Sequence, residues 1–284
     1  MENLELDKLF EDFLMEKEYV CGLSKLTLKG YRVMWRTFKR IIKDPTVSRE
    51  TFLCFTRELI TQGMQSKTVN TYISGLNSSL TWLRENGENS DNIRIKKIKE
   101  DKKIQPSYTN EELIKMLRWK PQTWPQERLK MMILTLVDTG CRIDELITLE
   151  RRNVDFQNMF IKVTGKGSKE RIIPMSVVLR KHLFPYAKHP YSLFFPSRTG
   201  QLLDYDNCLG DLKTTCFKLQ IPCKGFHGFR RSFARGFIKN GGDVFSLQLL
   251  LGHTDLSTTR LYVSLNHEEL KEIHLKNSIL SRLK

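Results

Sequence analysis

The sequence predicts a mostly α-helical protein of two domains, the second of which carries a small β-hairpin sheet. Three observations support this. Apolar residues recur at helical spacing through most of residues 1–86. Residues 91–106 are basic, lack aromatic side chains and have a linker composition. Beyond them, helical patterns alternate with two strand-like segments that flank a turn. We therefore expect a helical domain at 1–90, a basic linker at 91–106 and a mixed α/β domain at 107–284.

Local signals place the helices of the first domain. Ser24 is the expected N-cap of a helix with an apolar face at helical spacing. Further helices are expected over residues 48–62 and 66–86. Gly63 and Gly87 stand just past their ends, where a residue in the left-handed conformation commonly ends a helix.

The helix that follows Ser24 also carries a basic stripe, rotated from its apolar face. Such a stripe is more often a solvated face. Here its sign is unbroken until Asp44, which favours a surface that faces phosphates. The residues of this basic stripe are Lys25, Lys29, Arg32, Arg36, Lys39 and Lys43. In the linker, Lys96 and Lys97 suit a DNA backbone, although a plain solvated tether fits them nearly as well.

In the second domain, Thr109 and the acidic residues after it open a helix. An apolar helix is expected over residues 129–139, then Gly140 and a helix that begins near Arg142. Strands are expected at 159–163 and 171–175, joined by a turn rich in glycine and lysine. Further helices follow to the C-terminus.

The net charge of +15 indicates a polyanionic partner, of which nucleic acid is the first candidate. The excess is concentrated: residues 151–200 hold 10 basic and 2 acidic side chains. The alternative is a generally basic, soluble surface. The six cysteines fit no usual zinc pattern and are expected to be reduced thiols. With no apolar signal segment or membrane span in the sequence, we expect a cytoplasmic protein without membrane contact.

The second domain contains the side chains needed to attack a phosphodiester without a metal. Arginines hold a phosphate by paired hydrogen bonds, histidines move protons, and a tyrosine can be the nucleophile. Each residue alone also has an ordinary interpretation: Arg142 as an ion pair with Glu145, His227 as a core histidine, Tyr262 as a half-buried aromatic. The candidate residues are Arg142, Lys166, His227, Arg230, His253 and Tyr262.

The order and spacing of these segments resemble those of the tyrosine recombinases, the phage-integrase and Xer-like family. Residues 139–146 match the family's Thr-Gly-x-Arg-x-x-Glu-Leu, and residues 165–171 match its Gly-Lys-Gly-x-Lys-Glu-Arg hairpin. Residues 227–230 match His-x-x-Arg, and residues 251–262 match Leu-Gly-His followed by Ser-Thr-Thr and the nucleophile. The N-terminal helices look like the family's SAM-like core-binding domain, a less specific match.

The resemblance implies a reaction that needs no metal or other cofactor, and it implies a role for each matched residue. These are Arg142 and Arg230 as phosphate clamp, Lys166 as general acid, His227 as proton-handling histidine, His253 as hydrogen-bond partner of the phosphate, Tyr262 as nucleophile and Glu145 in support. Lys169, Arg171 and Arg231 are expected to contact DNA. Arg231 departs from many relatives and is either structural or a further phosphate contact.

The partner implied is double-stranded DNA with paired inverted core sites, bound by a homotetramer on two DNA sites, with accessory proteins left open. The apolar residues of the tail could pack in cis or in trans. Little chain precedes residue 20, which favours resolution of transposon cointegrates or replicon dimers at short core sites over integration by a phage or mobile element. More remote alternatives are a type IB topoisomerase and a catalytically idle DNA-binding protein.

Overall fold

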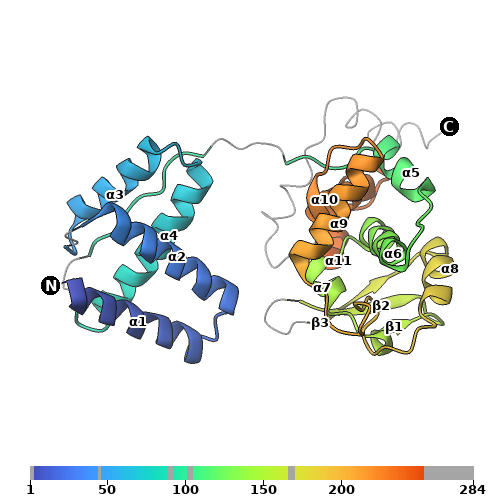
Figure 1. Ribbon diagram of the computed structural model, residues 1–284, viewed down its shortest axis with the longest axis horizontal. Helices are drawn as coiled ribbons and strands as arrows, with labels where there is room; N and C mark the ends of the chain where they lie inside the picture. Colours follow the sequence, from blue (N-terminus) through green and yellow to red (C-terminus); the bar gives the residue numbers. More distant parts are fainter. Residues whose placement is uncertain (1–2, 44–45, 89–91, 101–104, 166–169, 253–284) are drawn as a thin grey trace, which may run out of the picture. The chain divides into compact units, whose positions relative to one another are not determined.

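The computed structural model describes residues 3–43, 46–88, 92–100, 105–165 and 170–252. The chain divides into two compact units, Met1–Lys102 and Lys103–Lys284 (Figure 1). Helices dominate both units, and the described strands form one three-stranded antiparallel sheet in the second. This confirms the predicted fold class. Within the described ranges, no helix is both long and apolar enough to span a membrane.

The described residues of unit 1 form a bundle of four helices, and the sequence predicted the start of the second and the approximate bounds of the third and fourth. The Ser24 and Ser48 side chains accept hydrogen bonds from the first turns of α2 and α3. Gly63 and Gly87 follow α3 and α4 with φ values of 76° and 77°, the left-handed conformation that ends a helix. The helices are α1 (Asn3–Tyr19), α2 (Lys25–Ile41), α3 (Arg49–Thr61) and α4 (Ser66–Glu85).

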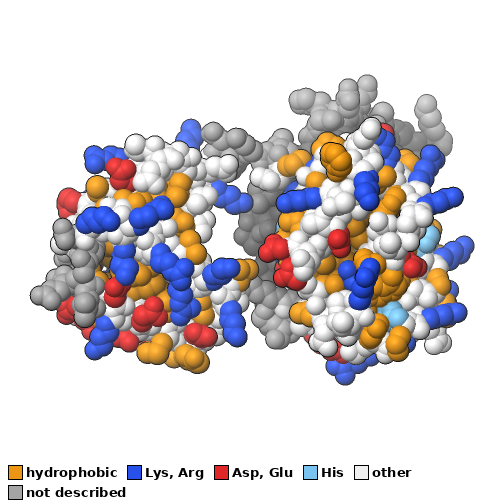
Figure 2. Space-filling model, viewed as in Figure 1, with side chains coloured by type: hydrophobic (Ala, Val, Ile, Leu, Met, Phe, Trp, Pro, Cys, Tyr) orange, Lys and Arg blue, Asp and Glu red, His pale blue; other side chains and the backbone are white. Residues whose placement is uncertain are grey.

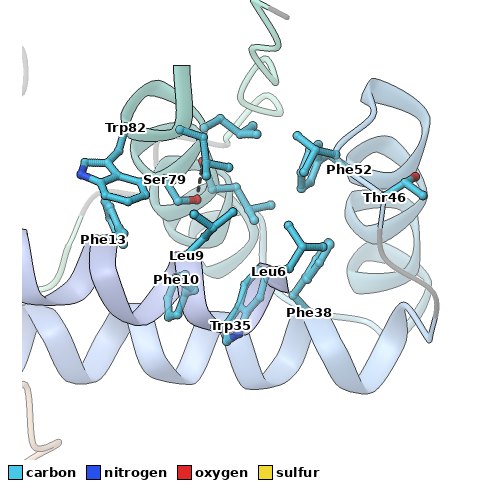
Figure 3. A pocket seen from close by; sticks show the side chains of 14 residues that line it. Leu6, Leu9, Phe10, Phe13, Trp35, Phe38, Thr46, Phe52, Ser79 and Trp82 are labelled. Carbon is cyan, nitrogen blue, oxygen red and sulfur yellow. Dashed lines mark hydrogen bonds between the residues drawn. The ribbon is translucent and has the colours of Figure 1, made fainter. Parts of the chain in front are cut away.

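The core of unit 1 is rich in stacked aromatic rings. Phe10 stacks on Trp35 with ring centroids 4.5 Å apart, and Trp35 stacks in turn on Phe38 at 5.3 Å. These rings line a cavity of about 30 Å³, and Figure 3 shows that side chains from α1, α2, α3 and α4 surround it. That volume holds about one water molecule, and an apolar lining keeps such a cavity dry. The cavity is therefore a packing feature of the core.

The segment 92–100 differs from the expected linker, because it packs on α4 as part of unit 1. Ile95 is only 3% exposed and belongs to the aromatic core. The amide of Asn77 donates to the carbonyl oxygen of Ile95 and accepts from its N–H, both at 2.9 Å. Asn70 makes the same pair of bonds with Ile98, again at 2.9 Å. The side chains of two asparagines thus form hydrogen bonds with the backbone N–H and C=O groups of this segment, as a neighbouring strand would.

Unit 2 surrounds the buried helix α6 with other helices and one sheet. Helix α6 packs against α5, α8, α9 and α10 (Figure 1). The elements are α5 (Asn110–Arg118), α6 (Trp124–Thr139), α7 (Ile143–Ile147), η1 (Arg151–Asn153), β1 (Val154–Asp155), β2 (Phe160–Thr164), β3 (Glu170–Pro174), α8 (Val177–Tyr186), α9 (Tyr205–Lys218), α10 (Gly225–Lys239) and α11 (Val244–Leu251).

The predicted hairpin is present, and the sheet order is β1-β2-β3. The sequence did not reveal β1, which has only two residues. Ile161 lies opposite Ile173, and Val163 lies opposite Arg171. Since side chains alternate along a strand, Arg171 shares the inner face of the sheet with Ile173. This register turns Arg171 toward the interior of unit 2.

Candidate active site

A single carboxylate, that of Glu145, connects two of the matched segments. Its side chain is 3% exposed. One oxygen accepts hydrogen bonds from Arg171 Nη1 at 2.7 Å and from Arg142 Nη1 at 3.0 Å. The other accepts from Arg171 Nη2 at 2.8 Å and from the backbone N–H of Arg142 at 2.7 Å. Glu145 therefore holds the hairpin strand β3 against the start of α7.

These contacts also settle the charge of Glu145. Burial by itself would raise the pKa of its carboxyl, but the hydrogen bonds from Arg171 and Arg142 outweigh burial and hold the pKa below its ordinary value. Glu145 is therefore ionised at neutral pH, and its negative charge offsets part of the repulsion between the two arginines.

Arg142 stands where two helices are joined by a tight turn. Gly140 ends α6 in the left-handed conformation, with φ 63°. Arg142 then takes an extended backbone as the N-cap of α7. Its side chain remains 34% exposed and bonds Glu145 through Nη1 alone. The rest of this guanidinium makes no hydrogen bond with the described residues, which leaves donors for an anion such as a phosphate.

Arg230 lies on α10 and is 2% exposed, which is unusual for an arginine. Its Nη1 donates to the carbonyl oxygen of Gly140 at 2.8 Å, and its Nη2 donates to the carbonyl oxygen of Leu251 at 2.7 Å. It thus connects the turn before Arg142 with the end of α11. That end leads directly to His253.

His227 precedes Arg230 by three residues and faces the same side of α10. It keeps an exposed edge. Desolvation lowers the pKa of its imidazole most, and the positive charges of Arg230, Arg231 and Arg142 lower it further, while Asp144 opposes them. His227 is therefore neutral at pH 7, the state in which an imidazole can accept a proton.

The start of α10 is held by Tyr108, a residue that the motifs did not single out. Its hydroxyl accepts a hydrogen bond from the backbone N–H of Lys224 at 3.0 Å. Its ring stacks on Phe229 with centroids 4.3 Å apart. A Cβ at Gly228 would lie 2.6 Å from the Tyr108 ring, so this position of the His-Gly-Phe-Arg segment has no room for a side chain. In the sequence, Tyr108 stood out only as an aromatic residue next to a helix cap.

Two of the expected DNA contacts have other partners in the structure. Arg171 is bound to Glu145 and to the carbonyl oxygen of Leu250, which is 3.0 Å from its Nε. Arg231 donates to the carbonyl oxygens of Pro106 at 2.8 Å and Lys224 at 3.4 Å. Both arginines thus hold the fold together, and for Arg231 this agrees with the structural alternative. In a sequence, an arginine that binds DNA looks the same as one that binds a carbonyl oxygen of its own chain. These contacts therefore could not be predicted.

The basic stripe on α2 is partly ion-paired within unit 1. Arg32 lies 3.8 Å from Glu11, and Lys39 lies 2.7 Å from Asp7. The sequence stripe did not predict these pairs because both acids come from α1. Figure 2 shows Lys and Arg side chains along the visible course of α2. The exposed basic residues of the stripe and of segment 92–100 are Lys25, Lys29, Arg36, Lys39, Lys43, Arg94, Lys96, Lys97 and Lys99.

Several expected site residues lie outside the described residues. They are Lys166 and Lys169 at the hairpin tip, His253, Tyr262 and the tail after it. The structure does describe Gly165 and Glu170 on the two sides of the hairpin tip, and Gly252 just before His253. As for metals, the described residues contain no group of three or more His, Cys, Asp or Glu side chains placed to hold an ion.

Comparison with known proteins agrees with this arrangement. Residues 107–269, more than half of the chain, match the phage integrase family. Tyrosine recombinase XerD of Listeria monocytogenes serotype 4b is 30% identical over 294 residues, covering 95% of this chain and 98% of that protein.

Solved structures show the same fold. The Tn1549 transposon integrase in complex with transposon right end DNA aligns with a TM-score of 0.75 at 16% identity, covering 95% of this chain and 99% of that one. A lambda integrase tetramer bound to a Holliday junction gives 0.74 at 16% identity, covering 92% and 79%.

The chain therefore belongs to the phage integrase family. Within that family it is a tyrosine recombinase, an enzyme that cleaves and rejoins DNA strands at specific sites by transesterification.

Proposed function

We propose that Tyr262 is the nucleophile and that Arg142, Lys166, His227, Arg230 and His253 assist it. The hydroxyl oxygen of Tyr262 attacks the phosphorus while its proton passes to a histidine. The bond from phosphorus to the 5′-oxygen breaks, and Lys166 protonates that oxygen. The product is a 3′-phosphotyrosyl link. A 5′-hydroxyl of the partner strand later displaces the tyrosine and restores a phosphodiester. No metal or other cofactor enters either step.

One observation carries this proposal: Arg230 and Arg171 hold together four segments that are far apart in the sequence. Arg230 binds the carbonyl oxygens of Gly140 and Leu251, and Arg171 binds Glu145 and Leu250. The turn with Arg142, the hairpin that leads to Lys166, the helix of His227 and the end of α11 are therefore neighbours. A catalytic group for phosphoryl transfer requires such a preorganised arrangement of cations and proton carriers.

The proposed partner is double-stranded DNA with paired inverted core sites. The exposed part of the basic stripe on α2 supports a role for unit 1 as the core-binding domain, with Lys25, Lys29 and Arg36 as phosphate contacts. A homotetramer on two DNA sites is proposed by analogy with the lambda integrase tetramer on a Holliday junction.

For the biological role, we propose resolution of replicon dimers or transposon cointegrates at short core sites. The similarity to XerD over almost the full length of both chains supports it. Integration of a mobile element is the second candidate, since the Tn1549 integrase shares the fold over 95% of this chain.

The test is covalent capture on DNA. Duplexes from the DNA that flanks the gene, nicked at successive positions, are incubated with the full chain and then denatured. We expect a protein–DNA adduct that maps to Tyr262. The Tyr262→Phe variant should bind the same DNA without any adduct, whereas Tyr205→Phe, a control at the start of α9, should react normally. DNA binding without adduct by the wild-type protein would favour the idle DNA-binding alternative.

A second measurement separates recombination from topoisomerase activity. A recombinase needs two copies of its site and exchanges flanking sequences between them. Relaxation of a supercoiled plasmid that lacks the site, with no exchange of flanks, would instead identify a type IB topoisomerase.

A further inference from the structure

Arg171 has an environment that differs from that of a DNA-binding residue. Its side chain is 14% exposed and uses all three of its nitrogen atoms within unit 2. Nη1 and Nη2 form a two-pronged bond with the two oxygens of Glu145, at 2.7 and 2.8 Å. Nε donates to the carbonyl oxygen of Leu250 at 3.0 Å. Little of this guanidinium is left for a phosphate.

Through Glu145, Arg171 acts on Arg142. The same carboxylate accepts the backbone N–H and the Nη1 of Arg142. Without Arg171, a buried carboxylate would keep only the bonds from Arg142, and the cost of an unsatisfied buried charge would favour a rearrangement. The orientation of the Arg142 side chain therefore depends on Arg171.

Arg171 also holds the end of α11, the described part of the chain that leads to His253. Leu250 is in the last turn of α11, where carbonyl oxygens lack partners inside the helix. The stem of Arg171 fills the space beside Gly252, where a Cβ would lie 2.9 Å from Arg171 Cδ. Gly252 adopts the left-handed conformation, with φ 64°, and directly precedes His253.

Arg171 is itself only five residues after Lys166, on the returning strand of the hairpin. The base of the hairpin, the Arg142 turn and the end of α11 thus meet at one side chain. We infer that Arg171 is a positioning residue for DNA cleavage, which acts through Glu145 and Leu250 to hold Arg142, the base of the hairpin and the end of α11 in place. This inference rests on the proposed function of Arg142, Lys166 and His253.

Two substitutions distinguish positioning from phosphate contact. Arg171→Lys keeps the charge but cannot form the two-pronged bond, whereas Arg171→Gln loses the charge as well. We expect both to slow adduct formation on the nicked duplexes by about 10- to 100-fold at saturating protein. The dependence of DNA affinity on salt should match that of the wild type. Arg152→Gln, in which an exposed arginine paired with Glu150 is replaced, is the matched control with a normal rate of adduct formation.

A direct contact between Arg171 and a phosphate would give different results. If Arg171 contacted a phosphate, Arg171→Lys would restore the rate, and Arg171→Gln would lower the slope of log affinity against log salt by about 1. Either result would overturn the inference.

A double-mutant cycle covers the case in which a variant folds poorly. If Arg171 acts through Glu145, Arg171→Lys should matter much less in a Glu145→Gln background than in the wild type, for both adduct formation and thermal unfolding. Additive effects would contradict the inference. A wild-type protein that binds DNA but forms no adduct would contradict the proposed function instead, and the cycle on thermal unfolding would still show whether the two residues are coupled.

Discussion

The buried guanidinium of Arg230 donates a hydrogen bond to the carbonyl oxygen of Gly140, 2.8 Å away. Gly140 ends α6 and lies two residues before Arg142. This hydrogen bond therefore fixes Arg230 to the turn that carries Arg142, the other arginine of the proposed phosphate clamp. Gly140 has a left-handed backbone, with φ 63°, and the ring of Phe233 occupies the space where a Cβ would be.

Replacement of Gly140 tests this connection. Gly140→Ala places a Cβ 2.3 Å from Phe233 in a left-handed backbone. We expect a loss of about 1–2 kcal/mol for the backbone and about 1–3 kcal/mol more for the clash. Gly241→Ala is the control, because Gly241 has φ 91° with open space around it and should show the backbone loss alone. Equal losses for the two variants in urea unfolding would contradict this account.

Gly228 allows the close approach of Tyr108 to α10. In Gly228→Ala the new methyl group would lie 2.6 Å from the Tyr108 ring and 2.9 Å from Lys224 Cβ. We expect the free energy of unfolding to fall by about 1–3 kcal/mol. Gly236→Ala, on the same helix with nothing within 4 Å, should raise it by up to about 1 kcal/mol. Thermal unfolding measures both, and a stabilised Gly228→Ala would refute the contact.

The asparagines of α4 are expected to hold segment 92–100 in place. In Asn77→Ala, the backbone of Ile95 loses both partners, which should cost about 1–3 kcal/mol. Amide hydrogen exchange at Ile95 should then become faster. The control is Thr81→Ala, one turn along α4, whose hydroxyl bonds only the helix backbone. If this segment were a free tether, Asn77→Ala would leave the exchange rate unchanged.

His227 should titrate below its ordinary pKa of 6.5, because desolvation and the neighbouring arginines disfavour its charged form. The unfolded histidine binds protons more readily, so its contribution to stability declines as pH falls through about 6.5 and below. Asp144→Asn should lower the midpoint further, since Asp144 is the residue that raises this pKa. Asp155→Asn should leave it unchanged. Imidazole NMR shifts give the midpoints, and an upward shift in Asp144→Asn would disprove the assignment.

Local features of the fold were predictable, because their signals lie within a few residues. The serine cap at Ser24, the capping box at Thr109 and the left-handed Gly63 each depend on one helix end, and the structure confirms them. The strands at 159–163 and 171–175 were displaced by one residue, since ladder pairing rather than composition sets their ends.

Long-range contacts were not predictable. Tyr108 bonds Lys224 across 116 residues, and no motif marks it. Arg171 and Arg231 look like DNA contacts in the sequence, because no local signal pairs Arg171 with Glu145 and Leu250, or Arg231 with the carbonyl oxygens of Pro106 and Lys224. The linker composition of 91–106 likewise concealed the buried Ile95 and its asparagine partner on α4.

Backbone carbonyl oxygens hold Arg230 and Arg231, and this affects the electrostatic potential around the two side chains. A carbonyl oxygen holds a guanidinium in place but carries no net charge, so it orients the cation without cancelling it. A carboxylate does cancel it, as Glu145 does for Arg171. In the proposed complex, a DNA strand that reaches Arg230 therefore exchanges its condensed counterions for a side chain that is already ordered.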